Sequence, residues 1–207
     1  MKEYMELDAE GKSKFSKSYV DEVIQTLNWL PHSDITKVIE ILEEGFMQWK
    51  KIFIAWNGWS AATASHMASD LQKTTLSKNP QTKTADNKFK AISLSDNTPV
   101  MTAWGNDEWY EYLFSEQLTA LWEKDDVLVV ITGSGNSKNI IQVVERAKEI
   151  WIKTIAFLWF TWWQVKNLVD QSILVDSTNY WPIEDAHMIL VHLVTAYFKQ
   201  QVQKRYE

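Results

Sequence analysis

The strongest structural signal in the chain is the stretch Val127-Leu128-Val129-Val130-Ile131-Thr132-Gly133-Ser134-Gly135-Asn136-Ser137. Its apolar half has no polar alternation, which is typical of a strand buried on both faces of a parallel sheet. Its second half consists of small residues and predicts a turn, after which helical spacing continues over 137–150. A buried strand, a tight turn and a helix in this order indicate an α/β fold.

The same alternation continues on both sides of this stretch. Short apolar runs predict four further strands, at 51–55, 91–94, 154–158 and 172–175. Apolar residues at helical spacing predict helices at 60–76, 108–121 and 164–169, and a long closing helix over 183–205. Because ligands of such sheets bind beyond the carboxyl ends of the strands, the turns that follow the strands are the first places to look for function.

We therefore predict a single domain over residues 1–207. Residues 1–50 are expected to form N-terminal helices, with Asp34 as the N-cap of the second. Residues 51–207 are expected to form an α/β core. This core is a doubly wound, five-stranded parallel sheet flanked by helices, and it closes with the long C-terminal helix.

The composition excludes several classes of protein. The chain has no cysteine, which excludes a disulfide scaffold, a cysteine nucleophile and a thiolate metal site. The net charge of −6 argues against a nucleic-acid partner. No apolar run has the length of a membrane span, and the polar N-terminus lacks the apolar core of a signal peptide. We expect a cytoplasmic protein with neither nucleic acid nor membrane as a partner.

Tryptophan outnumbers glycine by 12 to 6, which reverses their ordinary usage. Trp49, Trp122 and Trp151 each stand just past a predicted helix, where a left-handed backbone usually selects glycine. Trp56 and Trp59 stand in the strand-to-helix turn 55–60, where positive φ and close approach to a ligand also favour glycine. The pair Trp162-Trp163 falls in another expected loop.

Three interpretations of these tryptophans are open. They could form an aromatic surface that stacks on sugars or bases, or they could be ordinary packing residues. They could also come from UGA codons, which one genetic code translates as tryptophan and another as glycine. On this third interpretation the turn 55–60 becomes Ala-Gly-Asn-Gly-Gly-Ser, and many tryptophan positions should have positive φ or no room for an indole.

The turn Thr132–Ser137 has the composition of an anion site. Three hydroxyl residues and two glycines stand at a helix N-terminus, where free N–H groups and the helix dipole favour phosphate. The lysine of a P-loop is missing, so a nucleoside triphosphate is not the expected ligand. The alternative is a plain N-capped turn. The turn 55–60 could hold the same phosphorylated ligand from its other side.

Two helical segments carry possible metal ligands. His66 and Asp70 are four residues apart and share a helix face, and Glu184, His187 and His192 lie within nine residues of the last helix. A His and a carboxylate from each helix could hold a divalent metal such as zinc through nitrogen and oxygen ligands. For any single histidine, a structural role is the alternative.

Taken together, these motifs resemble the phosphoheptose isomerases of the sugar isomerase (SIS) domain superfamily, over residues 35–200. The resemblance rests on the turns 55–60 and 132–137, His66-x-x-x-Asp70, Gly105-Asn106-Asp107 and the segment from Ile183 to His192. It implies a flavodoxin-like three-layer sandwich and a homotetramer with active sites between subunits. Family members carry glycine at positions such as Trp56, Trp59, Trp109 and Trp163, which favours the codon interpretation.

The resemblance also implies an activity. Such enzymes are intramolecular oxidoreductases that convert sedoheptulose 7-phosphate to D-glycero-D-manno-heptose 7-phosphate through an enediol, in nucleotide-activated heptose synthesis. Asp70 would be the base and His192 the acid. Carried over by position, the zinc ligands would be His66, Asp70, Glu184 and His192, and the substrate-binding residues would be Asn57, Gly58, Trp59, Ser60, Asp70, Asn106, Asp107, Thr132, Gly133, Ser134, Ser137 and Glu184.

The chain also departs from the family pattern. Asp70 replaces a glutamate, Glu184 replaces a glutamine, and Thr132-Gly133-Ser134 replaces Ser-Thr-Ser. An indole at Trp59 would be expected to block the site. Two alternatives therefore stay open: an isomerase of a different ketose phosphate, and a non-catalytic relative. The latter would bind sugar phosphate as a regulator, or bind a replication initiator as an adaptor.

The codon interpretation makes a direct prediction about the gene. Most of the twelve tryptophan positions should be encoded by UGA, because a glycine codon translated by the wrong table gives tryptophan at glycine positions. Sequencing the coding DNA measures this, and UGG at most of the twelve positions would refute the interpretation.

Overall fold

The computed structural model describes residues 7–77, 79, 81, 88–133, 135–159 and 164–206. Its centre is a five-stranded sheet in which every pair of neighbouring strands is parallel. The strands are β1 (Lys51–Ala55), β2 (Lys90–Ser93), β3 (Val127–Thr132), β4 (Lys153–Trp159) and β5 (Gln171–Val175), in the order β2-β1-β3-β4-β5. This confirms the predicted fold class and all five predicted strands.

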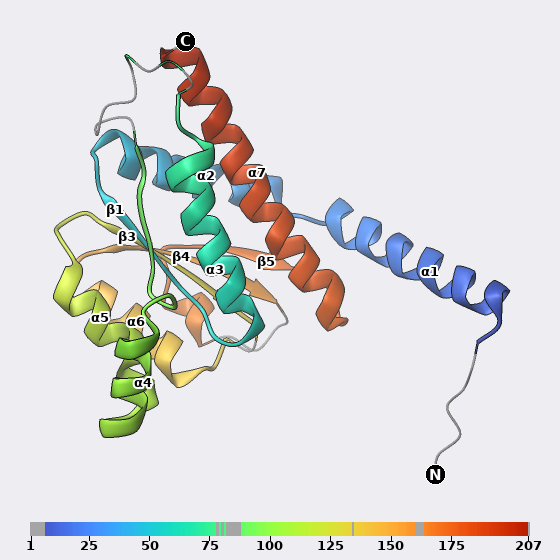
Figure 1. The fold of residues 1–207 in the computed structure, drawn as a ribbon, viewed down its shortest axis with the longest axis horizontal. Helices are drawn as coiled ribbons and strands as arrows, with labels where there is room; N and C mark the ends of the chain where they lie inside the picture. The colour runs from blue at the N-terminus through green and yellow to red at the C-terminus, as the bar shows by residue number, and fades with distance from the viewer. Residues whose placement is uncertain are drawn as a thin grey trace.

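Helices cover both faces of the sheet and give three layers (Figure 1). One apolar core joins the sheet to α2 (His32–Met47), α3 (Trp59–Ser69) and α7 (Tyr180–Tyr206). The other joins it to α5 (Leu113–Leu121) and α6 (Lys138–Glu149), with α4 (Thr98–Asp107) at its margin. β3 is buried along its whole length, which agrees with its continuous apolar sequence.

The strand order creates a switch point between β1 and β3. The chain leaves β1 into α3 on one face and leaves β3 into α6 on the other, so the two turns diverge from adjacent strand ends. In doubly wound sheets of this order the crevice between such turns is where ligands bind. The fold therefore brings the turns 55–60 and 132–137 together.

Several helix boundaries differ from the predicted ones. The expected helix at 108–121 was wrong in its first part: α4 ends at Asp107, Trp109 is extended, and α5 begins only after a 3₁₀ turn, Tyr110–Tyr112 (η4). The sequence does carry signals for α4, namely an N-cap at Asn97 and a proline in its first turn. The expected helix at 164–169 is only a 3₁₀ turn, Val165–Asn167 (η5).

The start of α2 also differs from the prediction. Asp34 is not its N-cap but lies in its first turn, because the helix already begins at His32 after Pro31. An acidic residue there still interacts favourably with the positive end of the helix dipole.

Two of the tryptophans that follow helices have a left-handed backbone. Trp49 has φ 60° and Trp151 has φ 61°. In both, the next N–H bonds back to the carbonyl five residues before it, Lys50 to Gly45 and Ile152 to Ala147, which is the Schellman helix end that glycine usually forms. The expectation was wrong for Trp122, whose backbone is extended at φ −68° and ψ 154°.

The N-terminal helix α1 (Ala9–Asn28) lies beside α7 and extends away from the body of the molecule (Figure 1). It exposes Phe15, Val20 and Ile24, and Thr26 is its buried residue. Among the described helices, none is long and apolar enough to cross a membrane.

The left-handed backbone at Trp151 makes a prediction about stability. Trp151→Gly should raise the free energy of unfolding by about 1 kcal/mol, because it relieves a strained Cβ while an indole that is 82% exposed loses little packing. In a chain of this size that corresponds to a rise in Tm of about 2–4 °C.

The matched control is Trp122→Gly. Trp122 also follows a helix, α5, but its backbone is extended and not left-handed. This change should lower Tm, because glycine gains no strain relief there and adds freedom to the unfolded chain. Thermal unfolding followed by circular dichroism measures both variants, and a Trp151→Gly variant no more stable than the parent would contradict the assignment.

Candidate functional site

Asn57 and Asn139 join the two turns at the switch point. Each side-chain amide donates to the carbonyl oxygen of the other, at 2.8 Å and 2.7 Å, and the Tyr110 hydroxyl donates to Asn57 Oδ1 at 3.3 Å. A pocket of about 330 Å³ opens beside this pair, and Ser137 also lines it. The structure therefore brings Asn57 and Ser137, predicted from separate motifs, to one cavity.

The turn after β3 and the start of α6 contain backbone N–H groups and small hydroxyl side chains. Thr132 is buried, and its Oγ1 accepts a hydrogen bond from the Gly135 N–H at 3.3 Å. Ser137 is the N-cap residue of α6, yet its hydroxyl makes no capping hydrogen bond. The first amides of α6 therefore lack this common partner, as an anion site requires. Ser134, predicted to bind phosphate, lies outside the described residues.

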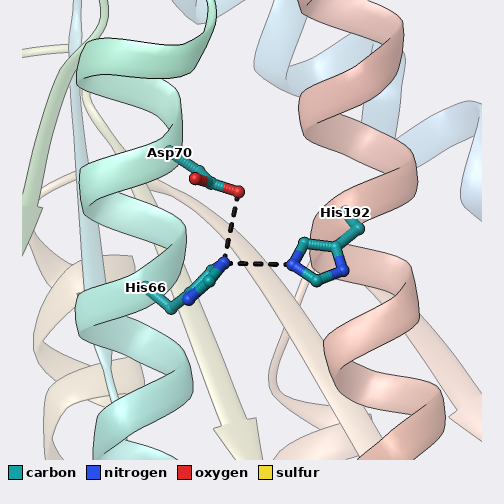
Figure 2. Close-up of side chains that lie close together, drawn as sticks. All are labelled: His66, Asp70 and His192. Carbon is teal, nitrogen blue, oxygen red and sulfur yellow. Dashed lines mark hydrogen bonds and ion pairs between the residues drawn. The ribbon is translucent and has the colours of Figure 1, made fainter.

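The structure confirms that the two histidine-bearing helices meet. Figure 2 shows His66 on α3 and Asp70, the residue that follows α3, pointing toward His192 on α7. His66 Nε2 lies 3.0 Å from His192 Nε2 and 3.3 Å from Asp70 Oδ2. These three residues form the only such group of three among the described residues, and we call it the 66–70–192 group.

Local helix geometry sets the place of Asp70. It ends α3 and opens a π-helical turn, Asp70–Thr74 (η1), within the segment predicted as one helix over 60–76. The Asp70 carboxylate accepts a hydrogen bond from Thr74 at 3.1 Å, which holds it toward His66. Single π-helical turns inside helices are frequent at functional sites.

The donors of the 66–70–192 group fit a divalent metal ion. Two imidazole nitrogens and one carboxylate oxygen converge, and these are the ligand atoms of catalytic zinc sites with an open position. At zinc–nitrogen distances of about 2.0–2.1 Å, two tetrahedral ligands lie about 3.3 Å apart, close to the spacing of the two histidine nitrogens. His66 and His192 are exposed, so an ion and a substrate could reach them.

Glu184, predicted as a fourth metal ligand, has other partners in the structure. It lies outside the 66–70–192 group and accepts a hydrogen bond from the buried Ser60 hydroxyl at 3.3 Å. The Tyr180 hydroxyl also donates to Glu184, and this bond, with smaller effects from desolvation and from the Glu184 charge, raises the pKa of Tyr180 to about 12. The structure thus links Glu184 to the turn 55–60.

His187 is fully buried in α7 and is not part of the metal group. Burial lowers its pKa to about 4, and a weak approach to the Leu158 carbonyl offsets only part of this effect, so its imidazole is neutral at pH 7. Neither ring nitrogen has a hydrogen-bond partner of normal geometry among the described residues. An unsatisfied buried polar group of this kind costs about 1–3 kcal/mol.

The remaining predicted site residues take different places. Gly58 has φ 60° and supplies the positive φ of its turn, whereas Trp56 and Trp59 do not. The Trp59 indole is 84% exposed at the start of α3, and the expectation that it blocks the site stays a prediction. Asn106 and Asp107 end α4, bond to each other at 2.6 Å and are exposed, with no bond recorded to the other predicted site residues that the structure describes.

Three residues at the site were missed by sequence reasoning. Tyr110 and Tyr180 gave no signal, because a lone tyrosine after a loop is common. Asn139 could have been found, since an amide on the buried, apolar face of a strongly amphipathic helix is an unusual choice. Its partner Asn57 explains why a polar side chain is buried there.

Known proteins share this sequence and architecture. Residues 17–158 match the SIS domain family. A phosphoheptose isomerase from Helicobacter pylori strain P12 is 33% identical over 178 residues, 86% of this chain and 87% of that protein. One from Clostridium acetobutylicum is 36% identical over 160 residues, 77% of this chain and 78% of that protein.

Solved structures agree with these sequence matches. A phosphoheptose isomerase from Francisella tularensis superposes with a TM-score of 0.81 at 27% identity, covering 94% of this chain and 100% of that one. The five-stranded parallel sheet, the paired turns and the sequence identity lead to one conclusion: the chain belongs to the phosphoheptose isomerase family of SIS domain proteins.

Proposed function

We propose that this protein is an aldose–ketose isomerase that converts sedoheptulose 7-phosphate to D-glycero-D-manno-heptose 7-phosphate, in the synthesis of nucleotide-activated heptoses. The observation that carries the proposal is the 66–70–192 group, in which a carboxylate and two imidazoles meet. A protein that only bound sugar phosphate, or served as an adaptor, would not need such a group. Phosphoheptose isomerase is also the name of the relatives that match most of the chain.

The two turns divide the work of substrate binding in this proposal. The turn 132–137 would hold the phosphate through backbone N–H groups and the hydroxyls of Thr132, Ser134 and Ser137. Residues 57–60 and Glu184 would line the sugar. Asn57 is held in place by Asn139, and Ser60 by Glu184, so this part of the site is already organised before substrate binds.

The chemistry is a proton transfer between two neighbouring carbons. Asp70 would remove a proton from C1 of the ketose, giving an enediol, and the proton would return at C2 to form the aldose. His192 would move the protons on the two oxygens, taking one from the C1 hydroxyl and giving one to the C2 oxygen. The 3.3 Å and 3.0 Å contacts that join both groups to His66 keep them on one side of the substrate.

A divalent metal such as zinc would be held by His66, Asp70 and His192. Glu184, which bonds to Ser60 in this structure, would have to turn toward the ion to become the fourth ligand that the resemblance implies. When bound, the ion would supply positive charge that stabilises the negative charge developing on the substrate oxygens. Asp70 and His192 then have two possible partners, metal and substrate. We infer that each acts on the substrate only while it is not bound to the ion.

The resemblance to tetrameric enzymes leads us to propose a homotetramer for this chain as well. The support in this structure is α1, which extends from the body and exposes Phe15, Val20 and Ile24. Apolar side chains on a protruding helix are typical of a surface that packs against another copy.

The isomerase activity is tested with sedoheptulose 7-phosphate and NMR detection of the aldose product. Two proteins should be assayed, the chain as printed and the chain with glycine at all twelve tryptophan positions, each with and without zinc. We expect turnover by the glycine form. If the glycine form gives no product in either condition, the proposed reaction is wrong, and turnover of another ketose phosphate would replace it.

In the active form, His192→Ala should keep the fold, because the side chain is exposed, and should lower turnover by about 10²–10⁴-fold. His32→Ala is the matched control, since His32 is an exposed histidine on α2, away from the 66–70–192 group. Turnover of the His192 variant near that of the control would remove His192 from the mechanism.

Metal binding is tested separately by calorimetric titration with zinc. Loss of a residue that only hydrogen-bonds to a metal ligand typically lowers metal affinity by roughly 10–100-fold. His66→Ala and His192→Ala should each lower zinc affinity by more than this, because each removes a direct ligand. His32→Ala should leave affinity unchanged. Equal zinc affinity in all of these variants would show that the ion binds elsewhere.

A further inference from the structure

Trp159 ends β4 directly beside the turn 132–137. A Cβ added to Gly133 would lie 2.5–2.7 Å from three carbon atoms of the Trp159 indole, so the ring is pressed against the Gly133 backbone. The indole is only 9% exposed. It therefore fills the space above the turn that was predicted to hold phosphate.

The Trp159 indole also contacts Tyr180, which is bonded to Glu184. The Tyr180 ring meets it edge to face, with centroids 4.6 Å apart, and the Tyr180 hydroxyl donates to Glu184. Glu184 in turn binds Ser60. The Trp159 indole is thus in contact with Gly133 of the turn 132–137 and with Tyr180, whose hydroxyl bonds to Glu184.

Trp56 fills a second space at the same end of the sheet. It follows β1, is 4% exposed and meets the buried His187 ring edge to face at 5.5 Å. His187 has two ring nitrogens without a normal hydrogen bond in the described residues, and the Trp56 indole packs edge to face beside them. A polar group in that position is typical of a space meant for water or ligand.

We propose that residue 159 determines whether the site accepts a sugar phosphate, and that the functional protein has glycine at positions 56 and 159. The left-handed backbones of Trp49 and Trp151 and the excess of tryptophan over glycine support glycine independently of the site. With glycine at 159, the space between the turn 132–137 and Glu184 is open. The inference rests on the proposed function for the kind of ligand, a phosphorylated sugar.

The experiment compares phosphate binding by the printed chain and by Trp159→Gly, with inorganic phosphate as the probe and ³¹P NMR titration as the measurement. The variant should bind phosphate saturably. Its affinity should be at least about tenfold higher than any affinity detected for the printed chain. Trp151→Gly is the matched control, because it makes the same change at an indole that is 82% exposed beyond α6, and it should behave as the printed chain.

A Trp159→Ala variant keeps the test valid if glycine impairs folding, which circular dichroism monitors. Alanine also clears the indole and should bind phosphate. The proposal is overturned if the printed chain already binds phosphate as well as the variants, or if neither variant gains binding. Loss of the fold in both variants also overturns it, because the indole would then be a required part of the core.

The double variant Trp56→Gly/Trp159→Gly separates this inference from the proposed reaction. If it binds phosphate but does not isomerise sedoheptulose 7-phosphate, the role of residue 159 stands and the proposed function fails. If the printed chain isomerises the sugar as fast as the double variant, the proposed function stands and the role of residue 159 fails.

Discussion

The parallel pairing of β1 with β3 is the constraint on which the rest of this structure depends. Ile52 to Ala55 lie in register with Val127 to Val130, so the two strands end side by side. The chain then departs to opposite faces of the sheet, which opens a crevice between the two turns. The reciprocal Asn57–Asn139 pair joins the two sides of this crevice with two hydrogen bonds, and each amide satisfies the other.

The same pairing fixes the distance between the two parts of the site. α3 starts directly after the turn that follows β1, and α7 packs on the same face of the sheet. Because both helices rest on one apolar core, His66 on α3 and Asp70, the residue that follows α3, face His192 on α7 without a loop between them. Side chains on rigid, packed helices keep their geometry better than side chains on loops, which suits a group proposed to transfer protons.

The fold could be predicted from sequence because its strands are short, apolar and buried, as Val127 to Thr132 shows. The meeting of His66, Asp70 and His192 could be expected only through the family resemblance, since spacing along the chain does not show which helix faces touch. Glu184 illustrates the limit: its position in the sequence suggested a metal ligand, whereas the structure gives it Ser60 and Tyr180 as partners. The contact of Trp159 with Gly133 could not be predicted from the sequence, because it depends on the register of β3 and β4.

The left-handed backbone at Trp49 and Trp151 has a consequence that reaches beyond this protein's stability. A helix end of the Schellman type is fixed by hydrogen bonds of the main chain, which form whatever side chain the residue carries. At these two helix ends the main-chain path is therefore the one that glycine usually forms, which agrees with the interpretation of these tryptophans as glycine codons. Trp49 and Trp151 are the two tryptophans in the left-handed region among the described residues, and at these two positions the backbone favours glycine.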